Sequence, residues 1–242
     1  MPIVNSRGRR PAAWPIFLVA LALAGTSGCQ RDEPAPSAPP PPAAPAVATD
    51  PADPKAAARE VGPITARIET TRGTIVASLE PNRCPILTAN FCFLARRGHW
   101  NGRPWEGISR VVRQCGPFEP TYALPREFVP GLYFDRGGML SMTKTTSDYD
   151  AKANGTRFFI TVKEQDRWNL DYPIFGTVTA GLDVAIALAP GDAVKSVTVE
   201  GDVERLLGLF PARIADWEAH LTGARKWTPG ATPPRTPDMA GP

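Results

Sequence analysis

Two adjacent aromatic residues, Phe158 and Phe159, carry the clearest chemical information in this 242-residue chain. They lie between Asn154-Gly155-Thr156-Arg157 and Ile160-Thr161, in a run that reads as one β-strand. Neighbouring side chains of a strand point to opposite faces of the sheet, so the two rings cannot enter the same core. One ring must line a second surface, and a large apolar ring there predicts a wall for an apolar ligand.

A second motif follows after a short loop, in the run from Trp168 to Val178, which ends as a strand containing Phe175-Gly176. The two histidines of the chain, His99 and His220, lie near no pair of cysteines, so the sequence lacks the spacing of a metal site. We therefore expect neither a metal nor a cofactor, and the chemistry must come from side chains alone.

The elements that would position these residues are mostly strands. Apolar residues alternate over 64–68 and 75–79 around Thr70-Thr71-Arg72-Gly73, which predicts a β-hairpin. Pro85 suits the first turn of a helix that ends near Gly98. Further strands are expected over 105–112, 138–142, 157–162, 174–178 and 193–200, with a second helix over 182–188. Many antiparallel strands with two helices predict a mainly β fold, a closed barrel capped at its ends.

The order of these motifs resembles the cyclophilin family of peptidyl-prolyl cis-trans isomerases. The family pattern is close to N-G-S-Q-F-F-I, followed by W-L-D and F-G-x-V, and its Gly-x-Leu-Ser-Met step stands here as Gly138 to Met142. The motifs keep the family's order over roughly residues 64–200. The resemblance implies a closed eight-stranded antiparallel barrel capped by two helices, over residues 63–200, and a proline-isomerising activity.

The chemistry of such an activity needs only two kinds of group. Rotation about an X-Pro bond faces a barrier of about 18–20 kcal/mol, because the prolyl nitrogen shares its lone pair with the carbonyl. A donor aimed at that nitrogen localises the lone pair, while an apolar pocket holds the ring and excludes water. A guanidinium suits this role because it is always charged and offers several donors. The resemblance assigns it to Arg110, in the run Ile108 to Val112; the alternative is a solvated strand arginine.

The resemblance also implies which residues hold the substrate. Phe159 and Met142 match the lining of the family's proline pocket, although ordinary core residues look the same in a sequence. The other residues implied are Leu170, Trp168 and Tyr172 at the pocket and Gln114, which stands for the glutamine that orients the arginine.

Several positions depart from the family pattern. Ser109 replaces the histidine before the arginine, and Arg157 replaces the glutamine of N-G-S-Q-F-F. Thr143-Lys144-Thr145 replaces the Ala-Asn-Ala segment that pairs with the substrate backbone. Arg157 and Lys144 add positive charge, which would disfavour basic substrates, bind acidic flanks or peptide carbonyls, or repel Arg110 and weaken catalysis. Three functions stay open: an isomerase, a non-catalytic proline-peptide-binding or chaperone module, and a structural envelope lipoprotein.

The N-terminus has the pattern of an export signal. Three arginines precede an apolar run from Trp14 to Ala24, which is too short for a membrane span of about 20 residues. Thr26-Ser27-Gly28-Cys29 resembles a bacterial lipobox, in which the cysteine is lipidated. We expect residues 1–28 to be a lipoprotein signal peptide and Cys29 to anchor a periplasmic protein to a membrane; ordinary secretion and a retained anchor are the alternatives.

The segments around the domain are of lower complexity. Residues 29–62 are rich in Pro and Ala and cannot bury enough apolar surface to offset chain entropy, so we expect a disordered, extended tether or an unselected tail. Residues 201–226 have the pattern of an amphipathic helical extension, and 227–242 that of a disordered tail.

Charge and cysteine content limit the partners. Taking the three signal-peptide arginines from 27 basic residues leaves 24, against 24 acidic ones, so we expect no nucleic-acid surface. Cys84, Cys92 and Cys115 are an odd number, which leaves at least one free thiol and leaves a disulfide between the other two open. The sequence predicts a monomer that acts on proline-containing polypeptides of the cell envelope and assists their folding.

Overall fold

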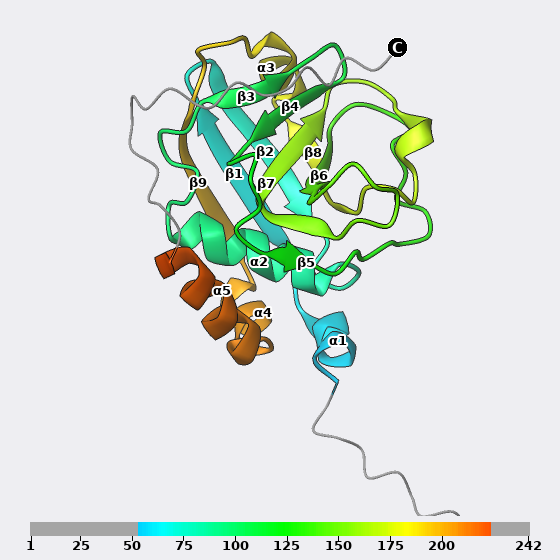
Figure 1. The fold of residues 1–242 in the computed structure, drawn as a ribbon, viewed down its shortest axis with the longest axis vertical. Helices are drawn as coiled ribbons and strands as arrows, with labels where there is room; N and C mark the ends of the chain where they lie inside the picture. The colour runs from blue at the N-terminus through cyan, green and yellow to red at the C-terminus, as the bar shows by residue number, and fades with distance from the viewer. Residues whose placement is uncertain (1–52, 224–242) are drawn as a thin grey trace, which may run out of the picture. The chain divides into compact units, whose positions relative to one another are not determined.

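The computed structural model describes residues 53–223, and in it the first two strands follow the alternation of the sequence (Figure 1). β1 (Ile64–Thr70) buries every second residue from Ile64, and β2 (Gly73–Leu79) every second residue from Ile75. The other strands are β3 (Trp105–Ile108), β4 (Val112–Cys115), β5 (Ala123–Leu124), β6 (Met139–Lys144), β7 (Ala153–Thr161), β8 (Ile174–Ala180) and β9 (Val194–Gly201). The helical segments are α1 (Pro54–Ala57), η1 (Ala58–Glu60), α2 (Pro85–Arg96), η2 (Asp166–Trp168), α3 (Leu182–Ala187), α4 (Val203–Gly208) and α5 (Pro211–Gly223).

All of the strands join one antiparallel sheet. Its order is β3-β4-β7-β6-β8-β2-β1-β9, and the two-residue β5 is added beside β7. An isolated bridge between Pro104 and Ala193 brings the two ends of the sheet together, so the barrel closes only in part. The prediction of a mainly β, eight-stranded antiparallel barrel with few helices is confirmed, apart from the incomplete closure.

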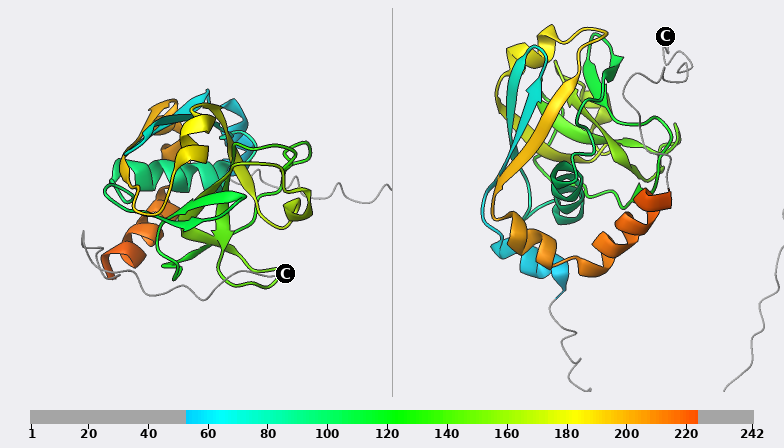
Figure 2. Two further views of the ribbon diagram at one scale, coloured as in Figure 1. Left: turned by 90° about the horizontal axis from the view of Figure 1, so that it is seen from above. Right: turned by 90° about the vertical axis from the view of Figure 1, so that its left-hand side faces the viewer.

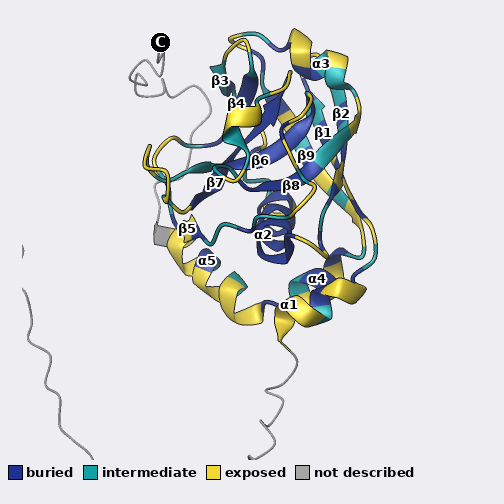
Figure 3. Cartoon of the chain, turned by 90° about the vertical axis from the view of Figure 1, so that its right-hand side faces the viewer, coloured by how far each residue is buried: buried dark blue, intermediate teal, exposed yellow. Residues whose placement is uncertain are grey.

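The interior of the curved sheet is filled by α2 and by inward-facing rings. Figure 2 shows α2 lying inside the curve, and each residue from Pro85 to Ala95 is buried (Figure 3). Phe91 on α2 contacts Phe158 edge to face at 5.5 Å between ring centroids, and Trp100 contacts Phe158 in the same manner at 5.0 Å. Phe158 is therefore the ring of the Phe158-Phe159 pair that enters the core, and Phe159 must point to the opposite face of the sheet.

The expected strand over 105–112 is wrong in one respect, because it is broken by a tight turn. The Ser109 hydroxyl accepts the backbone N–H groups of Val111 and Val112, and the Ser109 N–H donates to the Val112 carbonyl. A serine side chain that binds the backbone two or three residues ahead competes with strand pairing. β3 therefore ends at Ile108 and folds back as β4.

The segments next to the barrel also pack on it. α4 and α5 lie across one end of the barrel, where Trp217 packs on Phe93 at 5.8 Å and on Tyr122 at 6.2 Å between ring centroids (Figure 2). The predicted helical extension therefore consists of two helices. Residues 53–62, which the sequence assigned to a disordered tether, form α1 and η1 and bury Ala58 and Val61, so that boundary was wrong.

The three cysteines of the domain are buried and free. Burial raises the pKa of the Cys92 thiol to about 12, and burial likewise raises the pKa of Cys115 to about 12. The Cys84 Sγ donates to the Ile174 carbonyl at 3.0 Å, and burial raises its pKa as well. The predicted lipidation site, Cys29, and the tail from residue 224 lie outside the described residues, and within residues 53–223 no helix is long and apolar enough to cross a membrane.

Candidate functional site

The second ring of the Phe-Phe step lies on the outer face of the sheet. Phe159 belongs to an aromatic cluster, separate from the barrel core, whose buried members are Val112, Phe134, Met139, Phe159 and Ile174. Val111, Leu132, Trp168 and Tyr172 pack against this cluster. Centroid distances from the Phe159 ring are 6.0 Å to Phe134, 5.8 Å to Trp168 and 5.5 Å to Tyr172, so the structure brings Trp168 and Tyr172 to Phe159 as predicted.

Strand pairing determines which side chains share the face of Phe159. Gln114 on β4 and Ser141 on β6 lie directly opposite Phe159 in the two neighbouring strands. Arg157 and Thr161 lie two residues before and after it on β7 and therefore point to the same face. The candidate site is thus the outer face of β4, β7 and β6, with the loop 168–172 over it.

Arg157 places its guanidinium on this face, where three neighbouring residues hold it by hydrogen bonds. Its Nε donates to Gln114 Oε1 at 3.0 Å, and its Nη1 donates to Glu106 Oε2 at 3.1 Å and to the Gly116 carbonyl at 2.8 Å. Only 3% of the Arg157 side chain is exposed. Burial lowers the Arg157 pKa and the Glu106 carboxylate opposes that shift, so the group stays charged. The prediction that Gln114 orients Arg110 is not met within the described residues, where Gln114 accepts a hydrogen bond from Arg157 instead.

Arg110, the predicted catalytic arginine, lies outside the strands, and its catalytic role stays a prediction. It occupies the turn between β3 and β4, its side chain is exposed, and it makes no hydrogen bond or ion pair with residues 53–223. The neighbouring Val111 packs against the aromatic cluster, so Arg110 stands at its rim. The Ser109 turn is the physical reason that Arg110 lies between β3 and β4 rather than within a strand.

Two predicted pocket residues are also placed elsewhere. Met142 lies opposite Phe158 in the β6–β7 pairing and is fully buried in the barrel core, so it cannot line the outer face. Met139, three residues earlier and of opposite parity, takes the place beside Phe159. Leu170 is 55% exposed at φ 60°, a left-handed conformation that is rare for leucine, and it does not join the cluster.

The segment Thr143-Lys144 ties the loop to the sheet. Lys144 Nζ lies 2.7 Å from Asp171 Oδ1, with the two side chains 5% and 16% exposed, and 5.0 Å from the centroid of the Tyr172 ring. Burial, followed by the charge of Asp171, raises the Tyr172 pKa. The Thr143 hydroxyl donates weakly to the Arg157 carbonyl at 3.4 Å. The predicted groove residues thus make structural contacts, and the charge of Lys144 is neutralised by Asp171.

Several residues of the site could not be found by motif. Phe134 stacks on Phe159 from the loop before β6, and Asn169 holds it by accepting the Phe134 N–H at 2.7 Å. Glu106 and Asp171 neutralise the two cations that the sequence left uncompensated. The sequence did indicate that acidic partners must exist, because a buried cation requires one. It did not indicate that these partners are Glu106 and Asp171, because their positions depend on how the loops fold.

The site combines the apolar Phe159 ring with free donor hydrogens on Arg157, but other side chains cover the ring. The two Nη2 hydrogens of Arg157 make no hydrogen bond to the described residues, and the guanidinium lies 5.6 Å from the centroid of the Phe118 ring. Phe159 is only 2% exposed, beneath Phe134, Trp168 and Tyr172. A ligand can reach the ring only if these covering side chains move.

Comparison with known proteins identifies the family. Residues 65–204 match the sequence model described as cyclophilin type peptidyl-prolyl cis-trans isomerase/CLD. Peptidyl-prolyl cis-trans isomerase B of Bacillus subtilis is 32% identical over 130 residues, which is 51% of this chain and 88% of that protein. The human peptidylprolyl isomerase domain and WD repeat-containing protein 1 is 33% identical over 132 residues, or 50% of this chain, and this chain spans only 20% of it.

Solved structures give the same result. The crystal structure of a Cryptosporidium parvum cyclophilin type peptidyl-prolyl cis-trans isomerase matches with a TM-score of 0.52 and 25% identity, covering 58% of this chain and 99% of that one. A second structure of that protein, determined in the presence of the dipeptide Ala-Pro, matches with a TM-score of 0.50. With the family model spanning most of the domain and the outer-face cluster built from the Phe-Phe motif, this chain belongs to the cyclophilin-type peptidyl-prolyl cis-trans isomerase family.

Proposed function

We propose that this protein is a peptidyl-prolyl cis-trans isomerase that works on the outer face of β4, β7 and β6. The observation that carries the proposal is the placement of Phe159 and Arg157 two residues apart on one face of β7, about 6–7 Å along the strand. One supplies ring surface for a proline and the other a fixed guanidinium. The named isomerases among its relatives support the same reaction.

Arg157 acts here as the donor to the prolyl nitrogen. Its Nε and Nη1 hydrogens are held by Gln114, Glu106 and Gly116, so the Nη2 hydrogens are aimed in advance. Donation from Nη2 localises the nitrogen lone pair as the amide twists and stabilises the transition state more than the planar ground state. No bond to the enzyme forms, since rotation needs only the loss of amide resonance.

Access of the proline ring requires a displacement of the loop 168–172. Trp168 and Tyr172 cover Phe159 in the present arrangement, and Leu170 lies between them in the sequence with its side chain exposed to solvent. Binding energy must therefore be used to open the cluster, which lowers the affinity in proportion to the population of the open state.

The test is the rate of cis-trans exchange of a proline peptide, measured by NMR exchange spectroscopy. Wild type should accelerate exchange, and Phe159→Ala should abolish most of the acceleration because the proline loses its ring contact. Leu170→Ala is the matched control, since it removes an exposed side chain of the same loop and should leave the rate within about twofold. Failure of wild-type protein to accelerate exchange would exclude the isomerase.

A non-catalytic proline-peptide-binding or chaperone module is the second candidate. It is favoured by the covered state of Phe159 and by the position of Arg110 outside the cluster. This candidate predicts saturable binding of proline peptides that depends on Phe159 without any acceleration of exchange. The same samples distinguish the two functions.

The site of action that we propose is the periplasm, with the protein lipidated at Cys29 and assisting the folding of envelope proteins. The support is the order of signal-like run, lipobox-like Thr26-Ser27-Gly28-Cys29 and Pro/Ala-rich segment in the sequence. Mass spectrometry of the mature N-terminus tests this directly. A mature chain that begins at Cys29 and carries acyl chains agrees with the proposal, and an intact residue 1 contradicts it.

A further inference from the structure

The helix α5 lies beyond residues 65–204, the part of the chain that matches the family model. Figure 1 shows α5 beside α2, and the buried Trp217 is the aromatic residue of α5 at this contact. The Trp217 ring packs on Phe93 of α2 and stacks on Tyr122, with 14° between the planes of the stacked rings. Trp217 therefore links α5 both to the helix that fills the barrel and to Tyr122, the residue before β5.

Tyr122 in turn holds Gly155, the third residue of β7, in three ways. Its carbonyl accepts the Gly155 N–H at 3.0 Å. Its hydroxyl donates to Asn90 Oδ1 at 2.7 Å, and Asn90 Nδ2 donates to the Gly155 carbonyl at 2.7 Å. A Cβ atom at Gly155 would lie 2.2 Å from Tyr122 Cε2, so the ring lies directly on the glycine backbone. The backbone, the hydroxyl and the ring of Tyr122 thus fix one point of β7.

This point lies two residues before Arg157, in a segment with little free space. A Cβ atom at Gly116 would lie 2.2 Å from the Thr156 carbonyl oxygen, so the two backbones are in close contact. Gly116 also accepts a hydrogen bond from Arg157 Nη1, while Gln114 accepts one from Arg157 Nε. Because close-packed interiors transmit displacements, a shift of Gly155 should move Arg157 relative to these two acceptors.

We propose that Tyr122 is a positioning residue for Arg157 and that Trp217 of α5 keeps Tyr122 in place. The helical extension then contributes to the site without contacting a substrate. This inference rests on the function proposed for Arg157, because a donor to the prolyl nitrogen must be held to within about 0.5 Å of its productive position. The alternative is that α5 only stabilises the barrel and leaves the site of the folded protein unchanged.

The first measurement reads the environment of Arg157 directly, as the chemical shift of its Nε–Hε group in ¹H–¹⁵N NMR spectra of the full-length protein. This group donates to Gln114, so its resonance reports on that hydrogen bond. Trp217→Ala should shift the resonance, and Trp217→Phe, which keeps a ring against Tyr122, should restore most of it. Tyr122→Phe loses only the hydroxyl that contacts Asn90 and should produce a smaller shift, which keeps the test decisive if Trp217→Ala does not fold.

Kinetics on a proline peptide separate positioning from stability. Trp217→Ala should lower kcat by roughly tenfold with KM within about twofold, since displacing a group that acts in the transition state affects the chemical step. Leu206→Ala is the matched control, because it removes a fully buried side chain from the neighbouring helix α4. It should leave kcat and the Arg157 resonance unchanged. All variants are measured at a temperature at which urea unfolding shows them to be folded.

Three results would overturn parts of this account in different ways. An Arg157 resonance that stays in place in both Trp217→Ala and Tyr122→Phe, or that moves as far in Leu206→Ala, would exclude the coupling. A shifted resonance with unchanged kcat in an active protein would exclude the positioning role. If the wild type does not isomerise proline peptides, the proposed function fails, while the resonance still decides whether α5 holds Arg157.

Discussion

At the scale of single residues, the alternation of side chains along a strand decides which of them face the site. Phe158 enters the barrel core and Phe159 the outer cluster, and this division follows from alternation alone. The same rule separates Met139 from Met142, but the sequence does not state which methionine shares the face of Phe159. That choice depends on the β6–β7 pairing, which aligns Met142 with Phe158 and includes a bulge.

Arg157 and Arg110 illustrate the same limit for charged residues. A motif places an arginine in a chain, but a turn of three residues decides whether its side chain crosses the sheet or faces solvent. Here the Ser109 hydroxyl closes the turn, and Arg110 stays outside while Arg157 takes the inner position. Hydrogen bonds between a side chain and the backbone within a turn leave little trace in hydropathy or in motif spacing.

The first prediction concerns these two arginines. Arg157→Gln should lower kcat/KM for proline isomerisation by roughly 100-fold, the usual effect of losing one transition-state donor. Arg110→Gln should stay within about twofold, because the side chain is exposed and outside the cluster. The measurement is exchange spectroscopy on one proline peptide for both variants.

A control separates catalysis from structure in this comparison. Arg157→Gln leaves Glu106 without its partner, which costs about 1–3 kcal/mol of stability, so the double variant Arg157→Gln/Glu106→Gln is measured as well. Arg157→Lys keeps the charge and loses the forked geometry. Full activity in the double variant, or a large loss in Arg110→Gln alone, would contradict the role given to Arg157.

At the scale of elements, loops rather than strands determine access to the site. The loop 168–172 is held closed by the pair Lys144–Asp171, by the Asn169 contact to Phe134 and by the contact of Tyr172 with Phe159. Its two partners on the sheet, β6 and β7, were predicted from their residue patterns. The loop conformation was not, because it depends on pairs of residues far apart in the chain.

We expect the Lys144–Asp171 pair to contribute more than a surface ion pair. Its side chains are 5% and 16% exposed, whereas those of Arg136 and Asp135 are 60% and 56% exposed. A double-mutant cycle with Lys144→Met and Asp171→Asn, measured by urea unfolding, should give a coupling energy of about 1–2 kcal/mol, against about 0–0.5 kcal/mol for the exposed pair.

The same variants report on loop opening. Lys144→Met should speed hydrogen exchange at the Tyr172 N–H, which donates to the Trp168 carbonyl at 3.1 Å. A coupling energy near zero together with unchanged exchange would show that the ion pair does not hold the loop.

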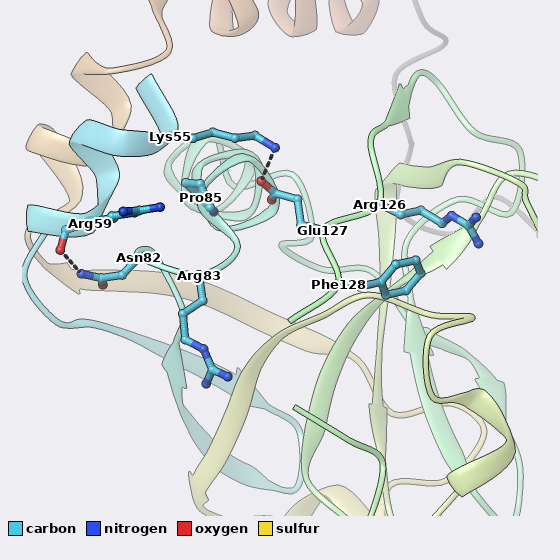
Figure 4. A pocket seen from close by; sticks show the side chains of 8 residues that line it. All are labelled: Lys55, Arg59, Asn82, Arg83, Pro85, Arg126, Glu127 and Phe128. Atoms are coloured by element: carbon cyan, nitrogen blue, oxygen red, sulfur yellow. Dashed lines mark hydrogen bonds and ion pairs between the residues drawn. The ribbon is translucent and has the colours of Figure 1, made fainter. Parts of the chain in front are cut away.

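At the scale of the whole molecule, the barrel acts as a scaffold whose inside and outside serve different purposes. The interior is filled by α2 and by the Phe91–Phe158–Trp100 rings, and the outside carries the aromatic cluster and, beside α1 and the start of α2, a pocket lined by four cationic side chains and one acidic one (Figure 4). Most of the strands, and the helices that became α2 and α3, were predicted from hydrophobic periodicity and from the positions of proline and glycine, whereas the order of the strands within the sheet was not predicted. The packing of residues 53–62 was not predicted either, because a short segment of Ala and Val in a Pro-rich context has no such periodicity.

Stability of the barrel should fall below neutral pH through His99. Its Nε2 is buried and makes no hydrogen bond that meets the usual geometry with residues 53–223, and its ring packs on Trp100. Burial, followed by the charges of Arg103 and Arg97, lowers the His99 pKa to about 3, against a smaller opposing effect of the Thr156 backbone. The histidine of the unfolded chain has a pKa near 6.5 and binds a proton first as the pH falls. The free energy of unfolding is therefore highest above about pH 6.5 and decreases as the pH falls toward 3.

The expected loss through His99 is about 2 kcal/mol between pH 7 and pH 5. Urea unfolding at both pH values measures it, and His99→Gln is the control because it cannot titrate. The burial-raised pKa of Glu127 acts in the opposite direction, and that contribution is common to both proteins. An equal pH dependence in wild type and His99→Gln would exclude His99 as the cause.

The burial of Cys84, Cys92 and Cys115 has a consequence for the export that we propose for this protein. In the folded barrel these thiols are neither ionised nor accessible, so oxidants and alkylating reagents have no sulfur to attack. The unfolded chain lacks this protection, so its thiols can be oxidised to disulfides that the native structure does not contain. In the oxidising compartment that we propose for it, folding that is fast relative to thiol oxidation should therefore increase the yield of native protein.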